Sequence, residues 1–427
     1  MELCHAVLNQ AFAGPQLNHW TLPNGTRCVT AEMPDAPLTC LDFWCRAGSA
    51  EEESGEEGMA HFLEHMLFKG SRQLPPGAFD QAIEALGGSS NAATGFDDVH
   101  FHVLIPPDRT SEALDHLLEL VLQPSLQPNG FATEREVVLE EIAQYADQPS
   151  EQVLQQLLSR GCGDHPYGRP ILGDPNTLRR MTPEAMKRFH QRLYQGGNCT
   201  LAMAGPDIDA LHEIVSTSQL ADVPAATGSR SSSNHHLQVQ SGHHELCIDR
   251  LESGRLLMLW AAAPALDQVA MMGADLATTL LGEGRRSRLV NHLREDLQLV
   301  ESVTMDLTAL EQGSLITLEA ICPADALADV EREVTTVLRS MADQAVSQSE
   351  YHRASQLVSN GLRFSLESTG QVAALSAGQV LWDRPQELLA PLDLLDQWSA
   401  ERIRAEVMPT LQPEQACVLV GRPGDMA

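Results

Sequence analysis

The chain has 427 residues, of which 28 are Lys or Arg and 58 are Asp or Glu, so its formal net charge is −30. This length predicts roughly two or three domains, and a hydrophobic fraction of 43% is typical of a globular chain rather than a disordered one. The negative charge argues against nucleic acid as a partner, because phosphates require Lys and Arg, and against an anionic membrane surface. A cationic partner stays open, although surface charge of this kind usually serves solubility.

The amino-terminal segment MELCHAVLNQAFAGPQ has no basic region and no sustained apolar run, so we expect no signal peptide. No stretch of about 18 apolar residues is present, which predicts no transmembrane helix. The nine cysteines are scattered and never spaced as CxxC, a pattern typical of reduced thiols. These features together predict a cytoplasmic protein.

The first chemical motif is GMAHFLEHMLFKG, residues 58–70, which we predict to be helical. His61 and His65 are four residues apart, so on a helix they share one face, and two neutral imidazoles at this spacing can hold one zinc ion. Glu64 borders the same face and can contact a water on that metal without ligating it. The order HxxEH inverts the HExxH zinc signature. The flanking apolar residues predict a buried helix, and this favours a metal site over an exposed polar face.

A strand, a Pro break and an amphipathic helix are predicted over residues 101–126, and residues 316–341 repeat that order. We interpret the repeat as a diverged internal duplication. The alternative is that two unrelated α/β domains share a common step by chance. His100 and His102 alternate onto one face of the first strand, and we do not expect these two residues to be ligands.

A second helix is predicted over residues 133–145, TEREVVLEEIAQY, with a capping box at Thr133. A catalytic zinc usually takes three protein ligands and a water, and this helix offers the third ligand. Glu134 and Glu141 are seven residues apart, which places them on one face two turns from each other. The spacing alone does not decide between Glu140 and Glu141.

Residues 225–244 are polar and poor in large apolar side chains, which predicts a linker. It separates residues 1–224, a zinc-binding catalytic half, from residues 245–427, a homologous second half. Both halves mix helices and strands, so the predicted class is α+β, with a mixed sheet and helices in each half.

Seven segments of the first half carry a family resemblance. They are, in chain order, TLPNGTRCV, FWCRAGSAEE, GMAHFLEHMLFKGS with the HxxEH motif, ALGGSSNAATGFDDVHFHV, FATEREVVLEEI, HPYGRPILGD and LAMAGP. These segments resemble, in the same order, those of the pitrilysin/insulinase family of zinc metallopeptidases, the inverzincins, which includes mitochondrial processing peptidase. That many matches in order are too many for chance.

The resemblance implies which carboxylate completes the site. In the family the third ligand is a Glu about 75 residues beyond the second His, and Glu141 lies 76 residues beyond His65. The implied Zn²⁺ ligands are therefore His61, His65 and Glu141. The resemblance also implies that Glu134 supports the site, and we place it with Glu64 among the catalytic residues.

Substrate binding and assembly follow from the same resemblance. Asn91 and Ala92 match the edge strand along which relatives add a peptide substrate as an extra strand. The family fold is two related halves that close as a clam-shell around a chamber. Chains of this length work in pairs in the family, so we expect a homodimer or a heterodimer with a paralogous subunit. An acidic chamber would favour basic peptides, and the run EEESGEE, residues 51–57, is a candidate patch.

The second half departs from the family pattern. Relatives carry an Arg and, seven residues later, a Tyr that bind substrate and stabilise the oxyanion. Here Arg294 is kept, but Glu301 occupies the Tyr position and Gln298 the position of a Gly. An ionised carboxylate cannot donate a hydrogen bond to an oxyanion. The expected function is a zinc endopeptidase whose partner supplies the Arg and Tyr, and the alternative is a non-catalytic peptide-binding or scaffold subunit.

Overall fold

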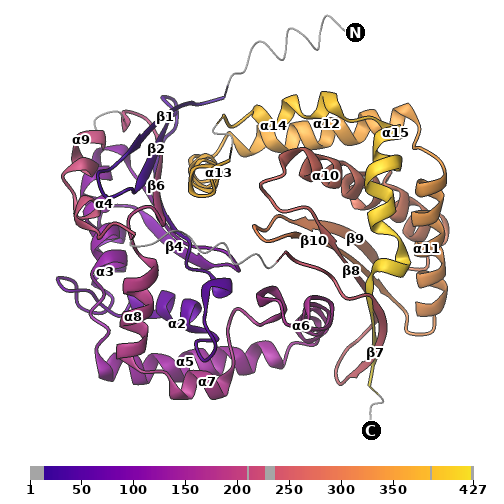
Figure 1. Ribbon diagram of the computed structural model, residues 1–427, viewed down its shortest axis with the longest axis horizontal. Coiled ribbons are helices and arrows are strands. Elements are labelled where there is room, and N and C mark those ends of the chain that lie inside the picture. Colours follow the sequence, from indigo (N-terminus) through magenta and orange to yellow (C-terminus); the bar gives the residue numbers. More distant parts are fainter. Residues whose placement is uncertain (1–13, 209–210, 227–235, 385–386, 425–427) are drawn as a thin grey trace, which may run out of the picture. The chain divides into compact units, whose positions relative to one another are not determined.

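The computed structural model describes residues 14–208, 211–226, 236–384 and 387–424 (Figure 1). Part of the predicted linker, residues 227–235, lies outside this described part. The linker's last residues differ from the prediction, because strand β7 already begins at Gly242. None of the helices in the described ranges combines the length and hydropathy that a membrane span requires.

Two compact units make up the chain. Unit 1 comprises residues 1–140, 171–231 and 362–390, and unit 2 comprises residues 141–170, 232–361 and 391–427. The division passes through one continuous helix, α5 (Pro128–Ala146).

Unit 1 is built on a six-stranded mixed sheet in the order β1-β2-β6-β3-β5-β4 (Figure 1). Only β2 and β6 are parallel among the paired strands of this sheet. Its strands are β1 (Gln16–Thr21), β2 (Arg27–Glu32), β3 (Thr39–Cys45), β4 (Ser89–Thr94), β5 (Val99–Ile105) and β6 (Cys199–Gly205). Strand β4 pairs with β5 alone, so it is an edge of the sheet.

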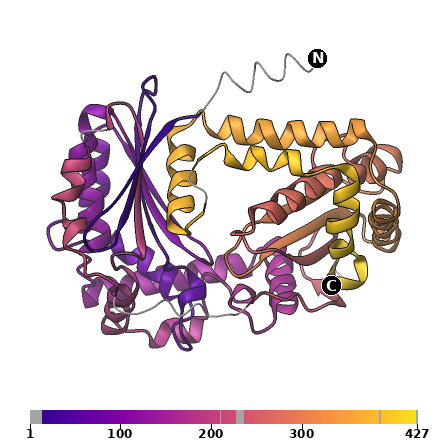
Figure 2. The same cartoon turned by 45° about the horizontal axis from the view of Figure 1, so that its top comes forward.

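Helices cover both faces of this sheet. The side chains of each strand alternate between the two faces, so each strand packs against helices on both sides. Helices α2 (Met59–Leu67) and α4 (Thr110–Leu122) pack on one face, where Phe101 of β5 lies beside Phe68. Helix α13 (Thr369–Leu381) packs on the other face, against Cys40, Ala202 and their neighbours. Figure 2 shows α13 in yellow-orange along one face of this sheet and magenta helices along the other.

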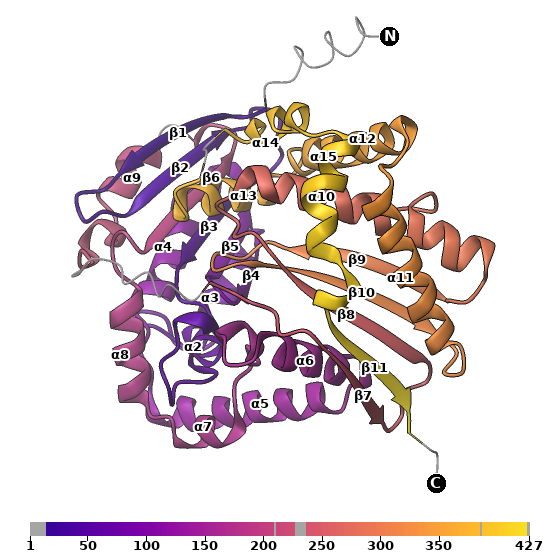
Figure 3. The same cartoon turned by 45° about the vertical axis from the view of Figure 1, so that its right-hand side comes forward.

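Unit 2 is built on a five-stranded mixed sheet in the order β7-β11-β8-β10-β9 (Figure 3). Its strands are β7 (Gly242–Ile248), β8 (Gly254–Ala262), β9 (Ser302–Thr308), β10 (Ser314–Cys322) and β11 (Cys417–Pro423). Helices α10 (Gln268–Gly282) and α11 (Leu327–Asp343) bury one face with Met258, Trp260 and Leu318. Helix α6 (Pro149–Cys162) packs on the other face, where Gly161 lies against Leu259.

The two sheets share one topology. Strands β2-β6-β3-β5-β4 follow the same order as β7-β11-β8-β10-β9. In each series the first pair is parallel and the other three pairs are antiparallel. The predicted strand–Pro–helix order is confirmed in both halves, as β5 followed by α4 and as β10 followed by α11. The shared topology agrees with an internal duplication.

The units also exchange one helix each. Helix α6 belongs to the first half of the sequence but packs on the second sheet, while α13 belongs to the second half and packs on the first sheet. The predicted halves, residues 1–224 and 245–427, divide the chain at the linker. That prediction did not include an exchange of helices between the two units.

The described residues contain seven further α-helices, short 3-10 turns and two π-helical turns, at Val290–Asp296 and Ile403–Val407. The helices are α3 (Ala78–Ala85), α7 (Pro175–Arg180), α8 (Pro183–Leu193), α9 (Leu211–Ser216), α12 (Gln348–Ser365), α14 (Ala390–Asp393) and α15 (Ala400–Arg402).

The capping box predicted at Thr133 is wrong. Helix α5 begins five residues earlier, at Pro128, whose fixed φ suits the first helical position. Thr133 is therefore inside the helix, and its hydroxyl donates to the carbonyl of Asn129 at 3.2 Å.

Candidate metal centre

Helix α2 carries the HxxEH motif and is anchored by its apolar side chains. Phe62, Leu63 and Met66 are almost fully buried. His61 is also buried, whereas Glu64 and His65 are half-buried. The rings of His61 and His65 are 4.6 Å apart between centroids, at an interplanar angle of 65°. The two imidazoles therefore lie on one face of the helix, as predicted.

The first turn of α2 is fixed by a carboxylate from outside the helix. Glu52 is 7% exposed, and it accepts hydrogen bonds from the backbone N–H groups of Gly58 at 3.0 Å and Ala60 at 2.9 Å. These N–H groups have no partner within a helix, and negative charge at a helix N-terminus is favourable. Glu52 therefore caps the start of helix α2, which carries the HxxEH motif.

Two sequence motifs meet at the start of α2. Gly58 has a left-handed φ of 95°, and a Cβ there would lie 2.7 Å from the carbonyl oxygen of Leu172 and 2.9 Å from Cα of Gly173. Gly173 belongs to the segment HPYGRPILGD and lies more than a hundred residues beyond Gly58 in the sequence. Only glycine allows these two backbones to approach so closely.

Helix α5 supplies the carboxylates. Glu134 is 5% exposed, and its Oε1 lies 2.9 Å from Nδ1 of His65, while Lys69 Nζ lies 2.8 Å from its Oε2. Glu141 is two turns further along the same uninterrupted helix. His61, His65 and Glu141 each offer one ligand atom, all within 4.8 Å of one another, and Glu140 is exposed and outside the group.

This donor set fits a zinc ion. Donors about 2.1 Å from one tetrahedral ion are roughly 3.4 Å apart, so the three side chains need only small adjustments. Burial, and secondarily the neighbouring His65, lower the pKa of His61 to about 4. His61 is therefore neutral at physiological pH, which is the form that ligates a metal.

Glu64 lies on helix α2, between His61 and His65. The hydroxyl of Thr94, the last residue of β4, donates a hydrogen bond to Glu64 Oε2. A hydroxyl that donates to a carboxylate fixes its orientation, so Glu64 is held on the same helix as the two imidazole donors.

Asn91 and Ala92 lie on the edge strand β4, as predicted. Asn91 is exposed, and its side chain accepts a hydrogen bond from the backbone N–H of Ala92 at 3.0 Å. Asn91 pairs with His102 and Ala92 pairs with Phe101 in the β4–β5 ladder. The opposite edge of β4 has no neighbouring strand among the described residues, so its backbone can accept one.

Arg294 and Glu301 are both placed in unit 2. Arg294 Nη2 lies 2.8 Å from Glu295 Oε1 in the π-helical turn. Glu301 is exposed and accepts a hydrogen bond from Ser253 Oγ at 3.0 Å. Gln298 has a left-handed φ of 53°, a conformation that favours glycine, which is the residue expected at this position.

The acidic run at residues 51–57 has internal partners. Glu52 caps α2, and the side chain of Arg192 lies 2.9 Å from Glu53 and 2.6 Å from Glu56. This run therefore serves to hold the segment before α2, and its charge is partly neutralised.

The contacts of three residues beside the site escaped the sequence reasoning, although their segments were singled out. Glu52 accepts from the backbone of α2, Lys69 contacts Glu134, and Thr94 donates to Glu64. Each partner lies in another element, so no periodicity or motif predicts these contacts.

Comparison with known proteins agrees with this architecture. Residues 27–175 match the family described as Insulinase (Peptidase family M16), and residues 180–358 match the Peptidase M16 inactive domain. An uncharacterized zinc protease of Mycobacterium tuberculosis is 27% identical over 409 residues, covering 95% of this chain and 93% of the relative. An uncharacterized zinc protease of Bacillus subtilis is 24% identical and covers 96% of this chain and 99% of the relative.

Solved structures show the same fold. A protease from Helicobacter pylori superimposes with a TM-score of 0.88 at 21% identity, covering 96% of this chain and all (100%) of the other. A structure of a peptidase M16 inactive domain from Pseudomonas fluorescens gives a TM-score of 0.85 at 19% identity, with 96% and 98% covered. With consecutive domains of one family matched along both halves, the chain belongs to the insulinase (M16) family of peptidases.

Proposed function

We propose that the chain is a zinc-dependent endopeptidase that hydrolyses peptides or small unstructured polypeptides. The observation that carries the proposal is the convergence of His61, His65 and Glu141 beside Glu64. The relatives named above are called zinc proteases, which agrees with this donor set. His61, His65 and Glu141 would hold the zinc ion, which would supply an acidified water and polarise the scissile carbonyl.

The chain's own residues perform the remaining steps. Glu64 accepts the proton of the attacking water and delivers it to the leaving amine. Thr94 holds the Glu64 carboxylate in place through its hydroxyl. The open edge of β4, near Asn91 and Ala92, binds the peptide backbone as an added strand and so fixes its register.

Substituting Glu64→Gln tests this role. Gln has nearly the same shape but cannot take a proton, so kcat falls by about 10²–10⁴ or more, while elemental analysis still finds zinc bound. Glu141→Gln lowers the zinc content instead. Glu140→Gln, an exposed neighbour on the same helix, is the matched control and leaves both zinc and turnover unchanged. Normal turnover by the Glu64→Gln protein would contradict the proposal.

The proposal also includes a partner subunit that completes the catalytic site. Glu301 stands where relatives have Tyr and is exposed, with a hydrogen bond from Ser253 Oγ, so this chain does not provide the Tyr hydroxyl as oxyanion donor. Since a second copy would carry Glu301 as well, we infer that a paralogous subunit supplies an Arg and a Tyr. The experiment is to purify the chain with its cellular partner and to assay peptide cleavage by the pure chain and by the complex.

The second candidate function rests on the same observation. A chain that lacks the oxyanion donor and hydrolyses no peptide, either alone or with its partner, would be a non-catalytic peptide-binding subunit. Peptide binding without cleavage by the complex distinguishes this candidate from the endopeptidase.

A further inference from the structure

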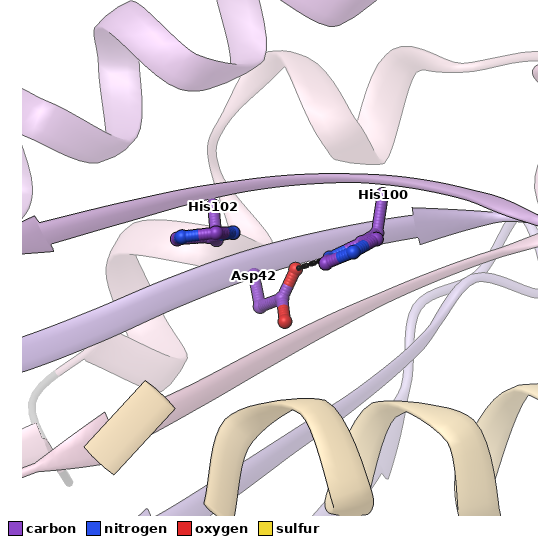
Figure 4. A group of neighbouring side chains, drawn as sticks. All are labelled: Asp42, His100 and His102. Atoms are coloured by element: carbon purple, nitrogen blue, oxygen red, sulfur yellow. Dashed lines mark hydrogen bonds and ion pairs between the residues drawn. The ribbon is translucent and has the colours of Figure 1, made fainter. Parts of the chain in front are cut away.

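A second group of possible metal donors lies in unit 1, in the sheet itself. Asp42 is on the inner strand β3, and His100 and His102 are on the neighbouring strand β5. His100 Nδ1 is 3.2 Å from Asp42 Oδ1, and Asp42 is directly opposite His102 in the register of the two strands. Figure 4 shows the Asp42 carboxylate between the two imidazole rings, and the three ligand atoms lie within 4.8 Å of one another.

This group is on the face of the sheet opposite the HxxEH helix. Residues of β5 alternate, so Phe101 points to the face on which α2 and α4 pack, and His100 and His102 point to the other. Trp44, two residues beyond Asp42, stacks on His100 with 4.6 Å between ring centroids and packs with the α13 cluster. The group therefore shares no residue with the peptidase centre and does not rest on the proposed function.

The chemistry of the group is that of a divalent transition-metal site. Two imidazole nitrogens and one carboxylate oxygen suit Zn²⁺, Co²⁺ or Ni²⁺ rather than Mg²⁺ or Ca²⁺, which prefer oxygen alone. The donors stand on paired strands, which hold them more rigidly than loops would.

Burial and access also fit an ion. Asp42 is 1% exposed, and a buried carboxylate needs a cation or several hydrogen bonds. The His100 side chain is 23% exposed, so an ion can reach the group from solvent. A simple Asp42–His100 pair accounts for one imidazole, but it leaves the position of His102 beside the same carboxylate unexplained.

We propose that Asp42, His100 and His102 form a second metal site, which binds Zn²⁺. From the sequence alone, His100 and His102 are not expected to be ligands, and this proposal differs from that expectation. Two histidines on one strand are too few ligands for a site by themselves. The third donor comes from a strand 58 residues away, and only the fold brings it into place.

The experiment counts bound metal. The full chain is freed of metal with a chelator, incubated with excess Zn²⁺, passed through a desalting column and measured by elemental analysis. The wild type retains two equivalents. His102→Ala retains one, His61→Ala retains one, and the double variant retains none. One equivalent in the wild type would overturn the proposal.

Co²⁺ provides a spectroscopic measure of affinity. Titration of the His61→Ala protein with Co²⁺ reports the second site alone by its visible absorption. Adding His102→Ala weakens this binding by at least about 100-fold, since loss of even an outer-sphere partner costs about 10–100-fold. His116→Ala, which removes a half-buried histidine of α4 outside the group, is the matched control and leaves binding unchanged.

A second variant guards against misfolding. Asp42→Asn keeps the size of the side chain and removes its charge, and it also eliminates the second equivalent. Thermal unfolding confirms that each variant is folded. A second equivalent that persists in folded His102→Ala and Asp42→Asn proteins belongs to other residues, such as His243 and His244 of β7, and would refute the assignment.

Discussion

The Glu134 carboxylate on α5 lies 2.9 Å from Nδ1 of His65 on α2. An ionised carboxylate only accepts hydrogen bonds, so Nδ1 of His65 carries the proton and Nε2 is left for the metal. The second oxygen of Glu134 is 2.8 Å from the ammonium group of Lys69, so both carboxylate oxygens have a partner. We therefore expect Glu134 to be a positioning residue that fixes the orientation of the His65 ring.

Glu134→Gln tests this positioning role. Gln still accepts the hydrogen bond but has no charge, so zinc affinity falls by about 10–100-fold, measured by competition with a chelator. Glu136→Gln changes an exposed carboxylate on the same helix and leaves the affinity unchanged. Equal zinc affinities for the two variants would show that Glu134 does not support the metal.

The contact of Gly58 with Gly173 makes a prediction about stability. Gly58→Ala must adopt a left-handed φ and also place a Cβ 2.7 Å from the carbonyl of Leu172. Gly77 is the matched control, since it also precedes a helix with φ of 77° but has nothing within 4 Å of its Cβ position. Gly77→Ala costs about 1–2 kcal/mol for the backbone conformation, and Gly58→Ala costs a further ~1–3 kcal/mol.

Urea denaturation measures both losses. If the two variants are destabilised equally, the backbone contact at Gly58 contributes nothing beyond its φ. Because α2 begins at this glycine, zinc content measured alongside shows whether the shift reaches His61.

The arrangement of the HxxEH residues on helix α2 could be predicted from the sequence, because it depends only on residues close together in the chain. Four residues separate His61 from His65, and helical periodicity alone places them on one face. The choice of Glu141 over Glu140 needed the family resemblance, since seven-residue spacing to Glu134 does not identify a ligand.

Other features depend on contacts that no periodicity encodes. The cap at Gly58 comes from Glu52, and the partner of His100 and His102 is Asp42, on another strand. The exchange of α6 and α13 could not be predicted either. An apolar face predicts that a helix is buried, but it does not identify the sheet against which the helix packs.

Gln298 offers a stabilising substitution. Its φ of 53° costs about 1–2 kcal/mol for a residue with a Cβ, and glycine avoids this strain. Glycine also has more conformational freedom in the unfolded chain, and this offsets part of the stability gained. Because Gln298 is exposed, Gln298→Gly loses little packing and raises the free energy of unfolding by about 0.5–1 kcal/mol. Gln298→Ala keeps the strain, so it is the control, and a Gly variant no more stable than the Ala variant would refute the argument.

His190 predicts how stability depends on pH. It is buried on α8, its Nε2–H donates to the carbonyl of Val121 at 2.8 Å, and its ring stacks on Tyr194 at 4.4 Å between centroids. Burial lowers the pKa of His190 from 6.5 to about 4, outweighing the opposite effect of the hydrogen bond. Between these values the unfolded chain binds a proton that the folded chain excludes, so stability rises with pH in this window.

The expected loss on going from pH 7 to pH 5 is about 2 kcal/mol from this histidine alone. Urea denaturation of the wild type and of His190→Gln at both pH values isolates it, because all other titrating groups are common to the two proteins. Gln keeps a donor for the Val121 carbonyl but cannot be protonated, so its stability falls less between pH 7 and pH 5. The same decrease in both proteins would mean that His190 is not the group that excludes the proton.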